Sequence, residues 1–177
     1  DRIPNAGIIY SKDHGKTWNI STLARTNTTE SQVAEVEPGV LMLNMRDNRG
    51  GSRAVSTTTD LGKTWKEHES SRTALQEPVC MASLISVKAK ENVLGKDILL
   101  FSNPNDAKNR HSITIKASLD GGVTWLPENQ LLLDAGWGWG YSCLTMIDKE
   151  TVGILYESSV AHMTFQAIKL KDIVKTK

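Results

Sequence analysis

A glycine-rich stretch at residues 136–144, Gly-Trp-Gly-Trp-Gly-Tyr-Ser-Cys-Leu, is the part of the chain best suited to chemistry. Its alternating glycines allow backbone angles that a side chain would forbid, so the chain can turn tightly and hold Tyr141 at the start of an apolar run, residues 143–147. A phenol has a pKa of about 10 and attacks poorly unless a base takes its proton. Packing is the alternative role, since a tyrosine with an apolar body and a polar tip suits the end of a strand.

Three charged side chains occupy similar positions at the ends of strand-like segments. Glu30 stands just before one segment and Arg46 ends the next, while Arg110 precedes a third. Taken singly, the glutamate is interpreted as a solvated carboxylate and each arginine as a surface charge near a turn, like Arg53. They form a site only if the fold brings them to Tyr141.

An eight-residue motif occurs three times and indicates how the fold is built. Its copies are residues 11–18 (Ser-Lys-Asp-His-Gly-Lys-Thr-Trp), 58–65 (Thr-Thr-Asp-Leu-Gly-Lys-Thr-Trp) and 118–125 (Ser-Leu-Asp-Gly-Gly-Val-Thr-Trp). The aspartates are 47 and 60 residues apart. This spacing fits repeats of about 40–50 residues with one insertion, the size of a four-stranded propeller blade.

The residue types of the motif predict a tight turn. The carboxylate and the Ser or Thr hydroxyl can accept backbone N–H groups inside their own loop, glycine supplies a left-handed residue, and tryptophan anchors the hairpin by burial. The competing interpretation makes Asp13, Asp60 or Asp120 a catalytic acid. A catalytic group is not needed three times, so the structural role is preferred.

Strand-like segments fill most of the remaining sequence. They are short, bounded by turn residues and rich in Val, Ile, Thr and Met, and they cover residues 6–10, 32–37, 40–46, 53–57, 79–87, 97–103, 112–118, 144–147, 152–157 and 162–169. Helix is weakly indicated, at residues 71–75 and 169–175, because neither has a sustained 3.6-residue apolar period. The predicted fold class is all-β, a β-propeller in which polar residues at inner strand ends converge on one site.

With these features together, the sequence resembles the sialidase (neuraminidase) family, and bacterial exo-sialidases in particular. The motifs that carry the resemblance are three Asp boxes of the form Ser-x-Asp-x-Gly-x-Thr-Trp, Glu30-Ser-Gln-Val-Ala-Glu-Val-Glu, Leu43-Asn44-Met45-Arg46, Tyr141-Ser142-Cys143-Leu144 and Leu155-Tyr156-Glu157. They span essentially the whole chain. An Asp box alone is weakly specific because it occurs in other folds, whereas the order Glu, Arg, Arg, Tyr is far more specific.

The resemblance implies a retaining glycosidase that removes terminal sialic acid from glycans or glycoconjugates with a tyrosine nucleophile. Tyr141 matches that nucleophile, and Glu30 matches the glutamate that takes its proton. Arg46 and Arg110 match the second and third arginines that grip the sialic acid carboxylate, a task that suits a planar guanidinium with two parallel donors. Glu157 matches a glutamate that orients the first arginine.

Two tryptophans beside the tyrosine, Trp137 and Trp139, have two interpretations. They would border the sugar or its aglycone, or they would pack at the rim.

The first arginine and the aspartate acid/base of the family find no match that fits the chain. Arg2-Ile3-Pro4 resembles the arginine motif, but Glu30 follows within one blade, so Arg2 is interpreted as a non-catalytic look-alike. Residues 1–177 are then expected to form the C-terminal part of a sialidase catalytic domain, about three blades of a six-bladed propeller. This piece alone would be inactive or nearly so, and its uncovered blade faces would tend to associate.

Two other functions stay open. A non-catalytic carbohydrate-binding propeller would keep the blades without the chemistry, although it would have no use for an activated phenol. A trans-sialidase would pass sialic acid to another sugar from the same tyrosyl intermediate.

Composition narrows the partners and the sites. A net charge of +1 argues against broad nucleic-acid or membrane-surface binding, and no apolar run approaches the roughly 20 residues of a membrane span. Cys80 and Cys143 lie in apolar runs and are expected to be buried free thiols. The four histidines are scattered, so neither a metal site nor a cofactor is predicted. Secretion, or a periplasmic location in bacteria, is implied by the resemblance alone.

Overall fold

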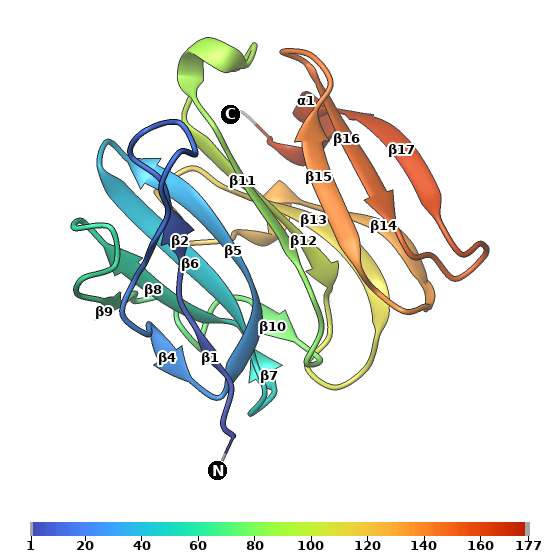
Figure 1. Ribbon diagram of the computed structural model, residues 1–177. Coiled ribbons are helices and arrows are strands. Elements are labelled where there is room, and N and C mark those ends of the chain that lie inside the picture. Colours follow the sequence, from blue (N-terminus) through green and yellow to red (C-terminus); the bar gives the residue numbers. More distant parts are fainter. Residues whose placement is uncertain (1, 176–177) are drawn as a thin grey trace.

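The computed structural model describes residues 2–175 and shows an all-β chain with three main antiparallel sheets (Figure 1). The first sheet contains β5 (Thr28–Glu37), β6 (Val40–Asp47), β8 (Ala54–Thr58) and β9 (Lys66–Glu67). The second contains β11 (Ser83–Val87), β12 (Ile98–Pro104), β13 (His111–Ser118) and β14 (Gln130–Trp137). The third contains β15 (Ser142–Met146), β16 (Thr151–Tyr156) and β17 (Thr164–Lys169).

Short elements complete the description. Three two-stranded pairs are formed by β1 (Asn5–Ala6) with β4 (Arg25–Thr26), β2 (Ile9–Tyr10) with β3 (Asn19–Ile20), and β7 (Gly51–Ser52) with β10 (Gln76–Glu77). The helical turns are η1 (Ala89–Glu91), η2 (Pro127–Asn129) and α1 (Leu170–Ile173).

The three main sheets are arranged as neighbouring propeller blades. β11 packs against both β5 and β15, so the first strands of the three sheets lie side by side (Figure 1). The second and third Asp boxes join the third strand of a sheet to its fourth, and the first box joins β2 to β3. Because an Asp box joins them as it joins the third and fourth strands of the other two sheets, β2 and β3 correspond to the outer strands of a further blade. The predicted all-β class and the partial propeller are confirmed.

Two apolar clusters fix these blades against one another. The cluster between the first and second sheets includes Met42, Val55, Leu84, Phe101 and Trp125. The cluster between the second and third includes Leu100, Ile115, Leu144 and Ile154. Truncating such a residue to alanine costs about 2–5 kcal/mol. Their packing therefore holds the inner strand ends, where polar residues meet, in one place.

Each Asp box folds as the predicted turn. In the first box, the two oxygens of Asp13 accept the N–H of Thr17 at 2.8 Å and its hydroxyl at 2.6 Å, while Gly15 has a φ of +85°. Asp60 and Asp120 repeat these bonds in the other boxes. Hydrogen bonds from the threonine four residues later lower the pKa of Asp13 and Asp60 to about 2. The carboxylates are used by the turns, which agrees with the structural role.

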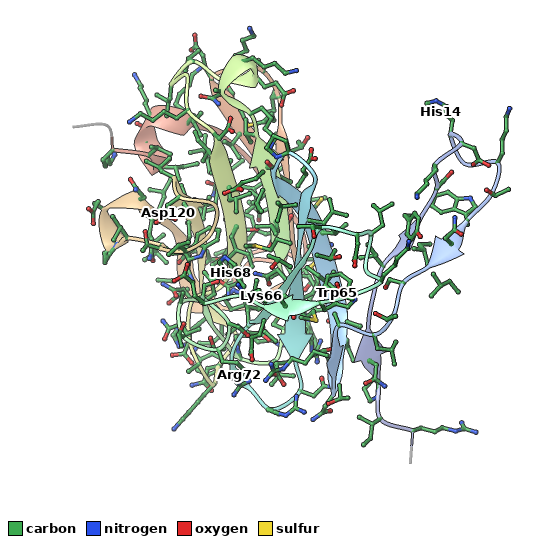
Figure 2. All side chains as sticks on the ribbon, turned by 90° about the vertical axis from the view of Figure 1, so that its left-hand side faces the viewer. His14, Trp65, Lys66, His68, Arg72 and Asp120 are labelled. Carbon is green, nitrogen blue, oxygen red and sulfur yellow. The ribbon has the colours of Figure 1, made fainter. Side chains whose placement is uncertain are left out.

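The tryptophans of the boxes are buried to different degrees. Trp125 is 7% exposed between two blades, whereas Trp18 is 62% exposed. Figure 2 shows that the hairpin carrying His14 projects from the body of the chain, so within residues 2–175 nothing covers its outer face. The predicted burial of Trp18 is therefore wrong.

Some elements differ from the sequence pattern. β14 extends to Trp137, so the glycine-rich stretch begins inside a strand that the pattern did not predict. Residues 79–82 precede β11 and are not part of it, and residues 71–75 form turns instead of a helix. The predicted helix at residues 169–175 is limited to the single turn of α1.

Cys80 is buried as predicted, but Cys143 is exposed, and its predicted burial is wrong. Cys143 lies opposite Leu155, which lies opposite Phe165, so the three form one row across the third sheet. Neither apolar partner is covered, since Leu155 is 40% and Phe165 60% exposed. The predicted association through uncovered blade faces stays a prediction. In the described part of the chain, no helix has the length and apolar character that a membrane crossing requires.

Candidate active site

An irregularity between β5 and β6 brings Glu30 to Arg46. The register shifts between Thr28 and Ser31, where β5 holds one residue more than the strand opposite. Such a β-bulge re-aims a side chain and is frequent beside functional sites. Glu30, inside the bulge, faces Arg46 with a distance of 2.5 Å between Arg46 Nη1 and Glu30 Oε2.

Tyr141 reaches this pair from the start of the third sheet. Its hydroxyl donates a short hydrogen bond to Glu30 Oε1, and Arg46 Nη1 lies 3.4 Å from the same hydroxyl. Gly140, just before it, has a φ of +89°, and a Cβ there would lie 2.6 Å from Pro104. The turn that delivers Tyr141 therefore requires this glycine. Of the three glycines in the stretch, only Gly140 uses the backbone freedom that glycine allows, since Gly136 and Gly138 lack a positive φ.

The charges of the site favour an ionised glutamate beside a protonated phenol. Partial burial disfavours ionised Glu30, but the hydrogen bonds from Tyr141 and Arg46 and the charges of Arg46 and Arg110 outweigh it and lower the pKa of the carboxyl. The hydrogen bond to Glu30, burial and the charge of Glu30 raise the pKa of Tyr141. At neutral pH the phenol keeps its proton, and the carboxylate in contact with it is ready to accept one.

Arg110 lies on the other side of Tyr141. Its Cζ is 5.8 Å from the centroid of the tyrosine ring, within the range of a cation–π contact. Its Nη1 donates to the carbonyl of Trp139 and its Nη2 to the carbonyl of Val79, both at 3.0 Å. All four residues predicted from the sequence are thus gathered, with Arg110 against the ring and the other three in direct contact.

Glu157 holds the backbone of Tyr141. Its Oε2 accepts the N–H of Tyr141 at 3.0 Å, and its own N–H donates to the Tyr141 carbonyl at 2.9 Å. These contacts fix where the tyrosine enters the site. The orientation of a further arginine by Glu157 stays a prediction.

A buried ion pair behind the site was missed by sequence reasoning, which interpreted Arg53 as a surface charge. Arg53 is 1% exposed, and its Nη1 lies 3.6 Å from Oε1 of the buried Glu77. Its guanidinium also donates to the carbonyls of Cys80 at 2.8 Å and Glu30 at 3.3 Å and to the side chain of Asn44 at 2.7 Å. The pair thus supports the backbone of Glu30. No local signal marks it, because Arg53 alone has the pattern of a surface residue at a strand end.

The arrangement can bind an anion and activate a phenol. Nη2 of Arg46 donates no hydrogen bond within residues 2–175, so one edge of this guanidinium is available to a ligand. In the same residues, no group of three or more His, Cys, Asp or Glu is placed to hold a metal ion.

Comparisons with known proteins identify the family of this chain. A family model described as BNR repeat-like domain matches residues 2–154. This chain belongs to the BNR repeat-like family. A sialidase of Bacteroides fragilis (strain YCH46) is 79% identical over 174 residues, which cover 98% of this chain and 32% of that protein. The resemblance to sialidases that the sequence motifs indicated is therefore confirmed.

Solved structures show the same fold. The Hadza microbial sialidase Hz136 aligns with a TM-score of 0.95 at 75% identity and covers 98% of this chain and 34% of its own. The Trypanosoma rangeli sialidase, seen as a covalent intermediate with 2,3-difluorosialic acid, aligns with a TM-score of 0.72 at 22% identity over 93% of this chain and 26% of its own. The chain spans about a third of the length of the Bacteroides and Hadza relatives.

Proposed function

We propose that this chain belongs to an exo-α-sialidase that hydrolyses terminal sialic acid from glycans or glycoconjugates with retention of configuration. The observation that carries the proposal is the hydrogen bond from the Tyr141 hydroxyl to the Glu30 carboxylate. The 79% identity to a sialidase supports the substrate class. A binding module has no need of a phenol in contact with an ionised carboxylate.

The reaction runs in two displacements. In the first, the Tyr141 oxygen bonds to the anomeric carbon and passes its proton to Glu30, while the glycosidic bond breaks and the leaving oxygen takes a proton from a general acid. In the second, water attacks the anomeric carbon and gives a proton to that acid, now a base. The bond to tyrosine breaks, and Glu30 returns its proton to the phenolate. Two inversions give net retention.

The site suits a substrate that carries its own carboxylate on the anomeric carbon. A carboxylate nucleophile would approach against like charge, whereas the protonated phenol of Tyr141 does not. Arg46, through the Nη2 that donates no hydrogen bond within residues 2–175, and Arg110 bind the substrate carboxylate and hold the anomeric carbon above the hydroxyl. Glu157 keeps the tyrosine backbone in register.

The general acid and the first arginine lie, in this proposal, outside residues 1–177. The chain spans about a third of the length of the Bacteroides and Hadza relatives, which leaves room for both groups elsewhere in a full-length protein. The 177 residues alone would then lack leaving-group protonation and be inactive or nearly so. Secretion or a periplasmic location is part of the same proposal.

The proposal is tested by removing one oxygen atom. In a full-length protein that contains this chain, Tyr141→Phe should lower kcat for a fluorogenic sialoside at least about 10²-fold, because the nucleophile is lost. Tyr10→Phe, at a tyrosine in the β2–β3 hairpin, is the matched control and should retain wild-type turnover. Wild-type turnover in Tyr141→Phe would contradict the assignment.

A further inference from the structure

A strained turn between β10 and β11 carries one of the two carbonyl groups that hold Arg110. Within this turn, Val79 has a φ of +53°, a rare conformation for a residue branched at Cβ. Such a conformation persists only where the surrounding structure holds it, and such conformations cluster at active sites. The Val79 carbonyl accepts a hydrogen bond from Arg110 Nη2 at 3.0 Å. The strain is therefore located at a backbone group that contacts the candidate active site.

The buried Arg53–Glu77 pair holds this turn in place. Glu77 is completely buried, and its Oε2 accepts the N–H of Cys80 at 2.7 Å. Arg53 Nη1 lies 3.6 Å from the other oxygen of Glu77 and donates to the Cys80 carbonyl at 2.8 Å. The pair thus binds both backbone groups of the residue that follows Val79, which fixes the chain on the C-terminal side of the strained residue.

A single peptide group links Glu77 to Arg110. The N–H of Cys80 and the carbonyl of Val79 belong to the same peptide unit, which is trans, so the two groups point in opposite directions. Glu77 binds this unit at the N–H, and Arg110 binds it at the oxygen. A carboxylate on the N–H side polarises the amide and strengthens its carbonyl as an acceptor. The buried carboxylate therefore acts on Arg110 without contacting it.

The second anchor of Arg110 comes from a different segment. Its Nη1 donates to the carbonyl of Trp139 at 3.0 Å. Two carbonyls thus set the plane of the guanidinium, and loss of the one at Val79 leaves the plane free to turn about the other. The plane matters because a guanidinium binds a carboxylate through two parallel, coplanar hydrogen bonds.

We propose that Glu77 is a positioning residue for Arg110 and acts through the Val79–Cys80 peptide group. The inference rests on the proposed function, in which Arg110 binds the carboxylate of sialic acid. Arg53 also donates to the carbonyl of Glu30, so the buried pair sets the place of the anion-binding arginine and of the base together.

Replacing the carboxylate by an amide tests the link. The two oxygens of Glu77 serve Arg53 and the Cys80 N–H, whereas the amide of Glu77→Gln has one oxygen and a nitrogen that only donates. In a full-length protein that contains this chain, the variant should bind free sialic acid at least about tenfold more weakly, because the hydrogen bonds from Arg110 to a carboxylate are weakened. The dissociation constant is measured by NMR titration. Glu69→Gln, at an exposed glutamate, is the matched control and should keep the wild-type affinity.

A double-mutant cycle shows whether the effect passes through Arg110. In an Arg110→Ala background, Glu77→Gln should change the affinity for sialic acid less than about twofold, since the guanidinium that Glu77 positions is gone. A general loosening of the fold would weaken binding with or without Arg110. An equal loss of affinity in both backgrounds would therefore overturn the inference.

A second variant separates positioning from folding. Arg53→Met combined with Glu77→Leu removes the pair without leaving an unpaired buried charge. This protein should fold, yet bind sialic acid at least about tenfold more weakly. In its crystal structure, Arg110 Nη2 should no longer lie within hydrogen-bond distance of the Val79 carbonyl. Wild-type affinity, or an Arg110 that keeps its place, would overturn the inference.

The proposed function and this inference fail on different results. A wild-type protein that neither cleaves a sialoside nor binds sialic acid would overturn the proposed function. The position of Arg110 in the crystal structure of the double variant would still decide whether Glu77 sets it.

Discussion

Two arginine–glutamate pairs lie next to each other in this molecule and differ in almost every property but their residue types. Arg46 and Glu30 approach to 2.5 Å with side chains 20% and 37% exposed. Arg53 and Glu77 are 3.6 Å apart and completely buried. The buried pair supports the open one, since Arg53 Nη2 donates to the Glu30 carbonyl at 3.3 Å.

The pKa values of the two pairs shift in opposite directions, although burial disfavours the charged forms in both. Loss of water lowers the pKa of Arg53 to about 10 and raises the pKa of Glu77, because the attraction between them only partly offsets desolvation. At the open pair, hydrogen bonds and charges outweigh desolvation, so the pKa of Glu30 is lowered and that of Arg46 raised. Solvent access and a third group, Tyr141, thus make one pair suitable for chemistry and leave the other a structural support.

The largest effect is expected when the open pair loses its base. Glu30→Gln should lower kcat for a sialoside about 10²–10⁴-fold, the usual contribution of a positioned general base. Its melting temperature should hardly change, because partly exposed ion pairs are worth about 0–1 kcal/mol. Glu37→Gln, on the same strand, is the control for kinetics and melting. If Glu30→Gln lowered the melting temperature on the order of 10 °C, as expected for the buried pair, the distinction between the two pairs would be lost.

The second prediction reverses that pattern at the buried pair. Glu77→Gln leaves Arg53 buried without its carboxylate and should lower the free energy of unfolding by about 3–5 kcal/mol. At roughly 2–4 °C per kcal/mol, the melting temperature should drop on the order of 10 °C. Glu69→Gln, at an exposed glutamate, should melt like the wild type.

A double variant checks the physical cause of that loss. Arg53→Met combined with Glu77→Leu should regain part of the lost stability, because apolar residues need no buried partner. A Glu77→Gln variant with the melting temperature of the wild type would show that the buried pair does not stabilise the fold.

A further prediction concerns Lys116, a buried lysine for which residues 2–175 offer no carboxylate partner. Lys116 is 2% exposed, its Nζ lies 5.7 Å from the ring centroid of Phe101, and burial lowers its pKa to about 7. Between this pKa and the ordinary 10.5, the unfolded chain binds a proton that the folded chain does not. The free energy of unfolding should therefore rise with pH across this window. Below pH 7 the full cost of burying the charged ammonium is present.

Lys116→Met is the variant that isolates this contribution. It should melt a few degrees higher than the wild type at pH 7, and the difference should shrink towards pH 10. Lys108→Met, at an exposed lysine, should leave the pH profile of melting unchanged. A constant difference between wild type and Lys116→Met at both pH values would show that the proton has no part in it.

Local patterns predicted the Asp boxes and most strand segments, and the resemblance to sialidases singled out Glu30, Arg46, Arg110 and Tyr141. The turns depend on residues within one loop, and ordered motifs along the chain identified the four site residues. Their roles in a reaction stay predictions, although their proximity is now observed.

What could not be predicted depends on contacts between distant segments. Glu77 lies 24 residues from Arg53, and neither has a sequence signature of burial. Cys143 has apolar neighbours in the sequence, yet it faces away from the clusters because strand residues alternate between faces. The β-bulge at Glu30 is likewise set by the register of two strands and not by a local motif.

Covalent trapping tests the central claim, that Tyr141 is a nucleophile served by Glu30. A full-length protein that contains this chain is treated with 2,3-difluorosialic acid, the compound seen in the T. rangeli covalent intermediate, and analysed by intact and peptide mass spectrometry. We expect one sialosyl adduct on Tyr141, formed more slowly in Glu30→Gln and absent in Tyr141→Phe. An adduct on another residue, or inhibition without any adduct, would contradict the account.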